Sequence, residues 1–170
     1  MGKSLKIGFF MLIEKILRIV INPYWRASLL RVCGATIGKN VRVYEVVLFN
    51  LGKGFNNLHI GDDVYIAPGC RLDLEGRIFI GKGATLSPGV SIISHSDPGS
   101  THNSPLCSYF KPMVEDVNIG EYCWIGCNSV ILAGSKIGEQ AVVGACSLVK
   151  GVLMPKCVYF GTVAKKIREL

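Results

Sequence analysis

The stretch from residue 119 to residue 150 reads IGEYCW-IGCNSV-ILAGSK-IGEQAV-VGACSL-VK and repeats every six residues. Each hexad begins with isoleucine or valine, and glycine follows that residue in four of the five complete hexads. The fifth place of each hexad holds a small side chain: Cys123, Ser129, Ser135, Ala141 and Ser147. A period of six fits neither an α-helix, which repeats at about 3.6, nor an alternating hairpin ladder. The repeat therefore predicts a solenoid.

A chain with this period turns a corner in every hexad. The aliphatic residue points inward and stacks on its equivalent one turn away, while the small residue fits the corner. Three hexads then close one turn of a triangular prism, whose flat strands run parallel to those of the neighbouring turns. Solenoids leave their core open at both ends, so we expect caps at the two termini.

The pattern resembles that of the hexapeptide-repeat acyltransferases, in particular the branch that O-acetylates galactosides, maltose and polysaccharides. The resemblance covers residues 33–170 and implies an all-β fold, a left-handed parallel β-helix with three hexads per coil. The left hand comes from the resemblance alone, because right-handed crossovers are the general rule. The family also implies a homotrimer, with each active site built between two subunits.

The composition fits one domain of this kind. The 170 residues are 49% hydrophobic but only 9% aromatic, as a core of stacked valine and isoleucine requires. The formal net charge of +7 attracts phosphates, acidic glycans or an anionic membrane without distinguishing them. The seven cysteines match no zinc motif, and a reducing cytoplasm is the expected compartment. No nucleic-acid-binding module is recognisable, so no nucleic-acid partner is expected.

Residues 1–32 precede the repeat. The segment from Leu5 to Ile21 predicts a helix ended by Pro23, with a wide apolar stripe and a narrow polar face. Its longest uncharged run is too short to span a bilayer, and no cleavage site for a signal peptide follows it. The helix either caps the open end of the prism or packs against a neighbouring subunit, or residues 5–31 lie on the inner membrane face. In the second role four residues would lie near the headgroups: Tyr24, Trp25, Arg26 and Arg31.

Residues 33–158 form the predicted β-helix. Its first coil is expected to carry an irregular excursion between Tyr44 and Asn57, and a later coil has two extra residues near Gly76 to Phe79. The period stops at His95, and residues 96–116 contain three prolines and no repeat. A loop of this length in a tight solenoid is usually functional. Residues 159–170 are expected to leave the repeat as a basic tail.

His95 is the candidate catalytic residue, because it closes a strand (SIISH) directly before the loop and should face a crevice. Acyl transfer from a thioester to an alcohol needs a base at the hydroxyl, and histidine suits that role. The position also matches the catalytic histidine of the family. Either Glu75, which register places beneath it, or Asp73 or Asp97 can orient the imidazole, although each can equally be a solvated corner charge. The resemblance further implies acceptor contacts from Asp73, and we add Asp97 and Trp124 as candidates.

Coenzyme A is implied as the acyl donor by the same resemblance. Its pantetheine arm would lie along the prism against the backbone of Cys127 and Ala145, one coil apart. Trp124 would point outward beside the histidine of an adjacent subunit, or serve as a packing residue of the trimer.

The chain ends in basic residues that suit the nucleotide phosphates of the donor. The sequence GTVAK, residues 161–165, is similar to the family's GxPAK and implies phosphate contacts by Lys165 and Arg168. The family's threonine–lysine pair is altered here, and Lys150 can replace the lysine. A solubilising basic tail is the alternative interpretation.

These features favour an acetyl-CoA-dependent O-acetyltransferase that acts on a saccharide, with His95 as general base. An amine acceptor, in an amino sugar or a drug, is one alternative. A zinc enzyme resembling the γ-class carbonic anhydrases would need His59, His95 and His102 to converge on one metal, and we expect no metal. A non-catalytic scaffold is the last alternative, and the histidine at the loop mouth argues against it.

Overall fold

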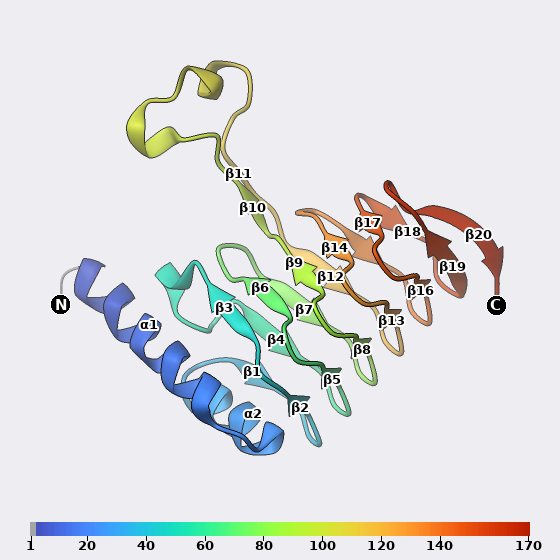
Figure 1. Cartoon of the computed structure of the whole chain (residues 1–170), viewed down its shortest axis with the longest axis horizontal. Coiled ribbons are helices and arrows are strands. Elements are labelled where there is room, and N and C mark those ends of the chain that lie inside the picture. Colours follow the sequence, from blue (N-terminus) through green and yellow to red (C-terminus); the bar gives the residue numbers. More distant parts are fainter. Residues whose placement is uncertain (1–2) are drawn as a thin grey trace.

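In the computed structural model, which describes residues 3–170, two helices precede a stack of short strands (Figure 1). The helices and strands are α1 (Lys3–Ile19), α2 (Pro23–Val32), β1 (Thr36–Ile37), β2 (Arg42–Val43), β3 (Val47–Phe49), β4 (Leu58–Ile60), β5 (Tyr65–Ile66), β6 (Arg71–Asp73), β7 (Ile78–Ile80), β8 (Thr85–Leu86), β9 (Ser91–Ile92), β10 (His95–Ser96), β11 (Met113–Val114), β12 (Val117–Ile119), β13 (Trp124–Ile125), β14 (Val130–Ile131), β15 (Lys136–Ile137), β16 (Val142–Val143), β17 (Leu148–Val149), β18 (Val152–Leu153), β19 (Cys157–Phe160) and β20 (Lys165–Glu169). Three short 3₁₀ turns are η1 (Leu51–Lys53), η2 (Ser100–His102) and η3 (Pro105–Ser108).

Three sheets, parallel except where β20 joins β19, form the faces of a triangular prism. Their orders are β1-β4-β7-β12-β15-β18, β2-β5-β8-β13-β16-β19-β20 and β17-β14-β9-β6-β3. In the regular part, Ile119 pairs with Ile137 and Ile125 with Val143, eighteen positions ahead in each case. Three hexads therefore make one coil, and the fold is the predicted left-handed parallel β-helix.

The hexad explains the core. The aliphatic residues that begin the hexads point inward and are buried, as Ile125 and Ile131 are. The small residues lie at the corners, where a larger side chain would collide with the backbone of the next coil. Ser129, for example, is fully buried and its hydroxyl donates to the carbonyl oxygen of Gly144 at 2.9 Å. Ser129 thus satisfies a buried backbone acceptor at the corner.

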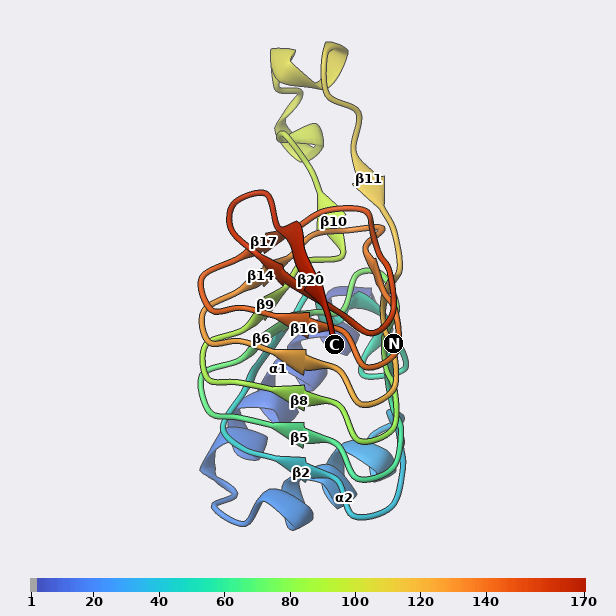
Figure 2. The ribbon, with the colours of Figure 1, turned by 90° about the vertical axis from the view of Figure 1, so that its right-hand side faces the viewer.

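The long loop leaves the prism on a stalk. β10 pairs antiparallel with β11, so that His95 lies opposite Val114, and residues 97–112 extend beyond this two-stranded ladder. Figures 1 and 2 show the loop standing clear of the prism in both views. The coil then resumes where it stopped, because β12 pairs in register with β7.

Two helices cover the end of the prism that carries β1, β2 and β3 (Figure 1). Leu17 of α1 and Leu30 of α2 are buried in one cluster with the interior of the first coil, and the ring of Phe10 packs edge-on against Phe55. The helices therefore close the open end of the hydrophobic core. Among the residues that the structure describes, no helix is both long and apolar enough to cross a bilayer.

The sequence pattern predicts a single helix that ends before Pro23, whereas α1 ends at Ile19 and Pro23 begins a second helix, α2. Proline suits the first turn of a helix, because the N–H it lacks would have no partner there. The side chain of Asn22 caps this turn by accepting from the backbone N–H groups of Tyr24 and Trp25.

Arg26 corrects a second expectation, since it does not face lipid headgroups. Its side chain is buried between the helices and the first coil. The guanidinium donates to the carbonyl oxygens of Leu17 at 2.7 Å, of Val43 at 2.8 Å and of Val20. It satisfies acceptors at the C-terminal end of α1, where a cation is favourable. Burial lowers the pKa of Arg26.

The tail begins later than predicted. Tyr159 still belongs to the prism, because it pairs with Val143 and its side chain is buried. Its hydroxyl accepts from the backbone N–H of Met154 at 2.7 Å, which allows a tyrosine to fill the last coil. After Phe160 the chain turns, and β20 folds back antiparallel on β19.

Candidate active site

His95 lies where β9 gives way to the stalk. The strand keeps its parallel pairing through Ile92, and the next residues turn outward into β10. The imidazole is about one third exposed. The end of a strand in a packed sheet thus fixes the backbone of His95, while its side chain reaches the mouth of the loop.

Asp73, at the end of β6, contacts this imidazole directly. Its Oδ2 lies 2.5 Å from His95 Nδ1 and also accepts from the backbone N–H groups of Ser94 at 3.0 Å and His95 at 3.1 Å. The carboxylate is fully buried. Because an ionised carboxylate only accepts hydrogen bonds, the contact selects the tautomer of the neutral imidazole in which Nδ1 carries the proton and Nε2 has a lone pair. This is the tautomer that a general base needs.

Glu75 is not the partner of His95, and the prediction from register was wrong. Counting on from the pair Leu72–Ile92 puts Glu75 level with His95. The ladder stops before that point, because the N–H groups of Ser94 and His95 donate to the Asp73 side chain and the chain turns outward. The carboxylate that ends the strand therefore reaches the ring, whereas Glu75 is half-buried in the following turn.

Asn50 and Ser94 complete the arrangement, and the sequence analysis missed both. Asn50 Nδ2 donates to Asp73 Oδ1 at 2.8 Å and lies 3.3 Å from His95 Nδ1. The Ser94 hydroxyl donates to the carbonyl oxygen of Asp73 at 2.8 Å and accepts from the N–H of Gly76. Asn50 comes from the irregular excursion of the first coil, in the left-handed region at φ 57°. No six-residue pattern could have placed it.

The electrostatics keep Asp73 ionised. Burial by itself would raise the pKa of this carboxyl. The hydrogen bonds from His95, from Asn50 and from the backbone of Glu75 and Ser94 outweigh that effect, so the pKa of Asp73 lies below its ordinary value of 3.8. A permanent negative charge beside Nδ1 stabilises the imidazolium that forms when Nε2 accepts a proton.

Replacing Asn50 by alanine is expected to lower kcat about tenfold and to cost about 1–3 kcal/mol of stability, because a buried carboxylate loses one donor. The matched control is Asn40→Ala. Asn40 has the same left-handed backbone, at φ 52°, and donates to Asp63 at 2.9 Å, but this pair is exposed at a corner. Steady-state rates and thermal unfolding of both variants measure the difference. Equal losses in the two variants would contradict a role for Asn50 at the site.

The side chain of Asp97 forms its hydrogen bonds within the loop. Its Oδ1 accepts from the backbone N–H groups of Gly99 at 2.8 Å and Ser100 at 2.7 Å, and its Oδ2 accepts from the hydroxyl of Ser100 at 2.6 Å. These bonds lower the pKa of Asp97, those with Ser100 most strongly. The carboxylate thus shapes the first turn after the stalk and does not contact His95. Its predicted contact with the acceptor stays a prediction.

Trp124 lies on another face of the prism. β13 belongs to the sheet of β2 and β5, whereas β9, which leads to His95, belongs to the sheet of β3 and β6. The indole is exposed, and its Nε1 donates to the hydroxyl of Ser87 at 3.0 Å. One chain therefore does not bring Trp124 and His95 together.

The residues predicted to bind the donor's pantetheine arm follow one corner. Cys127 and Ala145 are both exposed and lie on successive coils, which the Cys146 N–H joins to the Cys127 carbonyl at 2.8 Å. A Cβ on Gly126 would lie 2.5 Å from the Ala145 nitrogen, so only glycine permits this approach of backbone to backbone. The corner offers an extended ligand a continuous backbone surface.

The three predicted phosphate contacts lie toward the C-terminal end of the prism. Lys150 is exposed directly after β17, and Lys165 is exposed in β20. Arg168 is also in β20, and its guanidinium donates to the carbonyl oxygen of Glu169 at 3.1 Å. The acidic side chain of Glu169 pairs with Lys166 instead, at 2.7 Å. Lys150, Lys165 and Arg168 are thus available to an anionic ligand.

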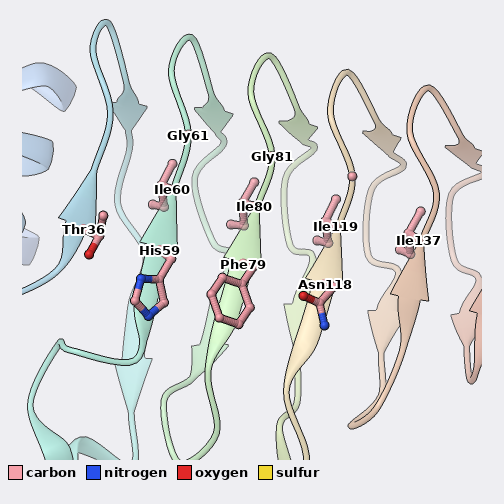
Figure 3. Close-up of a pocket in the computed structure, with 11 residues that line it drawn as sticks. Thr36, His59, Ile60, Gly61, Phe79, Ile80, Gly81, Asn118, Ile119 and Ile137 are labelled. Atoms are coloured by element: carbon pink, nitrogen blue, oxygen red, sulfur yellow. The ribbon is translucent and has the colours of Figure 1, made fainter.

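The three histidines do not meet within one chain. His59, in β4, stacks on Phe79 of β7 with ring centroids 4.7 Å apart. Both side chains face outward with Asn118 over a shallow hollow of about 480 Å³ (Figure 3). His102 lies in η2 in the loop. Over residues 5–170, no three His, Cys, Asp or Glu side chains gather as a metal site would require.

Comparison with known proteins supports the family resemblance seen in the sequence. Residues 116–151 match the family model "Bacterial transferase hexapeptide (six repeats)". The putative colanic acid biosynthesis acetyltransferase WcaF of Escherichia coli strain K12 is 34% identical over 146 residues, 85% of this chain and 75% of that protein. The galactoside O-acetyltransferase of the same strain is 30% identical over 145 residues, 85% and 68% of the two chains. A solved galactoside acetyltransferase in complex with coenzyme A has a TM-score of 0.78 at 25% identity, covering 99% of this chain and 91% of that one.

The fold and these relatives define an acetyltransferase that uses acetyl-CoA as its acyl donor. The chain belongs to the hexapeptide-repeat acetyltransferases.

Proposed function

We propose that this protein transfers the acetyl group of acetyl-CoA to a hydroxyl group of a saccharide, with His95 as the general base. The observation that carries the proposal is the contact between Asp73 Oδ2 and His95 Nδ1, which leaves Nε2 as the proton acceptor at the mouth of the loop. The relatives that act on galactosides and in colanic acid biosynthesis support a saccharide acceptor.

The chemistry is direct transfer in a ternary complex. His95 Nε2 removes the proton of the acceptor hydroxyl as its oxygen attacks the thioester carbonyl carbon. A backbone N–H stabilises the oxyanion of the tetrahedral intermediate. The C–S bond then breaks, and the departing thiolate of coenzyme A takes the proton from His95. The products are the acetyl ester and the free thiol, and the enzyme regains its starting protonation.

The donor would follow the corner that Cys127 and Ala145 share, with its phosphates near Lys150, Lys165 and Arg168. Trp124 would cover the thioester end from a neighbouring subunit, since it lies on a different face from the base of its own chain. The site is thus complete only in an oligomer, and a homotrimer gives every His95 one such neighbour. The absence of paired cysteines among the residues described fits a cytoplasmic enzyme.

The proposal is tested by following thiol release from acetyl-CoA with a panel of methyl hexosides and the matching amino sugars. We expect turnover with at least one hexoside, and an acetyl ester as product by mass spectrometry. Acetylation confined to the amine of the amino sugars would contradict O-acetylation. A light-scattering mass of one chain in the active fraction would contradict the shared site.

A further inference from the structure

The end cap, formed by α1 and α2, exposes an unusual amount of apolar surface. Of the 24 large hydrophobic side chains that are exposed on the described part of the chain, 11 lie in residues 5–32. On α1 they recur every three to four residues and therefore form one stripe along the helix. Its members are Leu5, Phe9, Leu12, Ile16 and Ile19. This stripe is distinct from the buried face of α1, on which Phe10 and Leu17 pack against the first coil.

The second helix also exposes large apolar side chains. Trp25, Leu29 and Val32 lie one turn apart on the outward side of α2, and Ile21 in the link between the helices is 92% exposed. An apolar surface of this extent marks a site of interaction with a partner or a membrane. Tryptophan and tyrosine are the residues that favour the boundary between lipid and water.

The positive charge of the end cap indicates which kind of partner it binds. Residues 1–32 contain six Lys and Arg residues and one acid, Glu14, which leaves a net +5 of the chain's +7. Glu14 is buried and pairs with Arg18 at 2.7 Å. Lys6 and Lys15 are exposed on either side of the stripe. Two such caps would repel each other, so charge opposes a second copy and favours an anionic bilayer surface.

The cap also lines a cleft that reaches Asn50, a residue of the candidate site. A cleft of about 340 Å³ lies between α1 and the first coil. Met11 and Lys15 line it from the helix, and Phe49 and Asn50 from the prism. Asn50 is the residue that contacts both Asp73 and His95. The cleft therefore extends from the exposed helix to Asn50, a direct neighbour of the proposed catalytic pair.

We propose that the end cap docks on an anionic bilayer and that the acceptor is a saccharide linked to a lipid of that bilayer. The substrate class rests on the proposed acetyl transfer, whereas the docking does not. In a trimer with parallel prisms the three caps lie at the same end, and all three can contact one membrane surface. The cleft then opens next to the lipid from which the sugar projects.

Docking is tested by co-sedimentation with vesicles of phosphatidylcholine, alone or mixed with phosphatidylglycerol. We expect binding to the mixed vesicles that Leu12→Ser with Ile16→Ser weakens at least about tenfold. Val152→Ser with Met154→Ser, which removes two apolar side chains at least as exposed at the opposite end of the prism, should leave binding unchanged. Lys6→Gln with Lys15→Gln should weaken binding to the mixed vesicles only. No binding, equal loss in the two apolar variants, or a lower oligomeric mass of the cap variant would overturn docking.

The substrate class is tested with hexadecyl glucoside in mixed vesicles against methyl glucoside in solution. We expect the wild type to prefer the anchored sugar at least about tenfold in kcat/KM, and the Leu12→Ser, Ile16→Ser variant to lose that preference while it keeps its activity on methyl glucoside. Equal use of both sugars, or activity on soluble hexosides alone, would overturn the lipid-linked class. If no hexoside is acetylated in either form, the proposed function fails, and vesicle binding alone decides the docking.

Discussion

Replacing His95 by alanine is expected to lower kcat/KM for acetyl transfer by about 10²- to 10⁴-fold, because the acceptor hydroxyl loses its base. The fold should persist, since the imidazole is partly exposed and the strand before it is held by Ile92. Thiol release from acetyl-CoA with a saccharide acceptor measures the rate, and circular dichroism checks the fold.

The matched control for His95→Ala is His59→Ala. His59 stacks on Phe79 on another face of the prism, so its loss should leave the rate unchanged. The zinc alternative makes the opposite prediction: both variants would lose activity together with bound zinc, which metal analysis of the purified proteins detects. Equal rates in His95→Ala and the wild type would refute the assigned base.

Replacing Asp73 by asparagine is expected to lower kcat about 10³-fold with a smaller change in KM, because the amide cannot fix the tautomer of His95 or balance the imidazolium charge. It should also cost about 1–3 kcal/mol of stability. Both oxygens of the Asp73 carboxylate accept hydrogen bonds. In the asparagine variant, the NH₂ group takes the place of one of these oxygens and faces the donors that bonded to it. The control is Glu75→Gln, the same chemical change two residues away, for which we expect nearly wild-type rates and stability.

The stability lost in Asp73→Asn should depend on pH in a known direction. The pKa of Asp73 is lowered in the folded chain, so its carboxylate contributes stability fully above the ordinary pKa of 3.8. That contribution disappears as the pH falls through the lower folded value. Denaturant titrations at neutral pH and well below pH 3.8 should therefore show a difference between wild type and variant that shrinks on acidification. A constant difference would mean that the charge of Asp73 is not its source.

The hexad repeat predicted the fold because one short rule governs each coil. Ile125 and Ile131 had to point inward, and Cys123 and Ser129 had to be small, and the structure confirms all four. The extra residues before Phe79 could also be located, because they only lengthen a coil that remains in register on both sides.

Asp73 was among the candidate partners of His95, but the same rule favoured Glu75 and could not find Asn50. Strand register predicts which residue lies one coil below as long as the backbone ladder continues. The prediction fails where side chains, instead of backbone carbonyls, accept the hydrogen bonds of the backbone N–H groups. Asp73 does so for the N–H groups of Ser94 and His95. Asn50 lies in the excursion of the first coil, where no period applies. The second helix could not be predicted from Pro23, because proline is found both after the end of one helix and in the first turn of the next.

The stalk of the long loop has a consequence for how this enzyme can diversify. His95 faces Val114 across the ladder, and β12 resumes its pairing with β7 as though the loop were absent. The length and sequence of the loop can therefore change without shifting the coils that follow it. Because His95, the proposed base, is the first residue of the stalk, a loop of any length or sequence would begin next to the pair of His95 and Asp73. Under the proposed mechanism, an exchanged loop would change the acceptor while the base and the proposed donor corner stay the same.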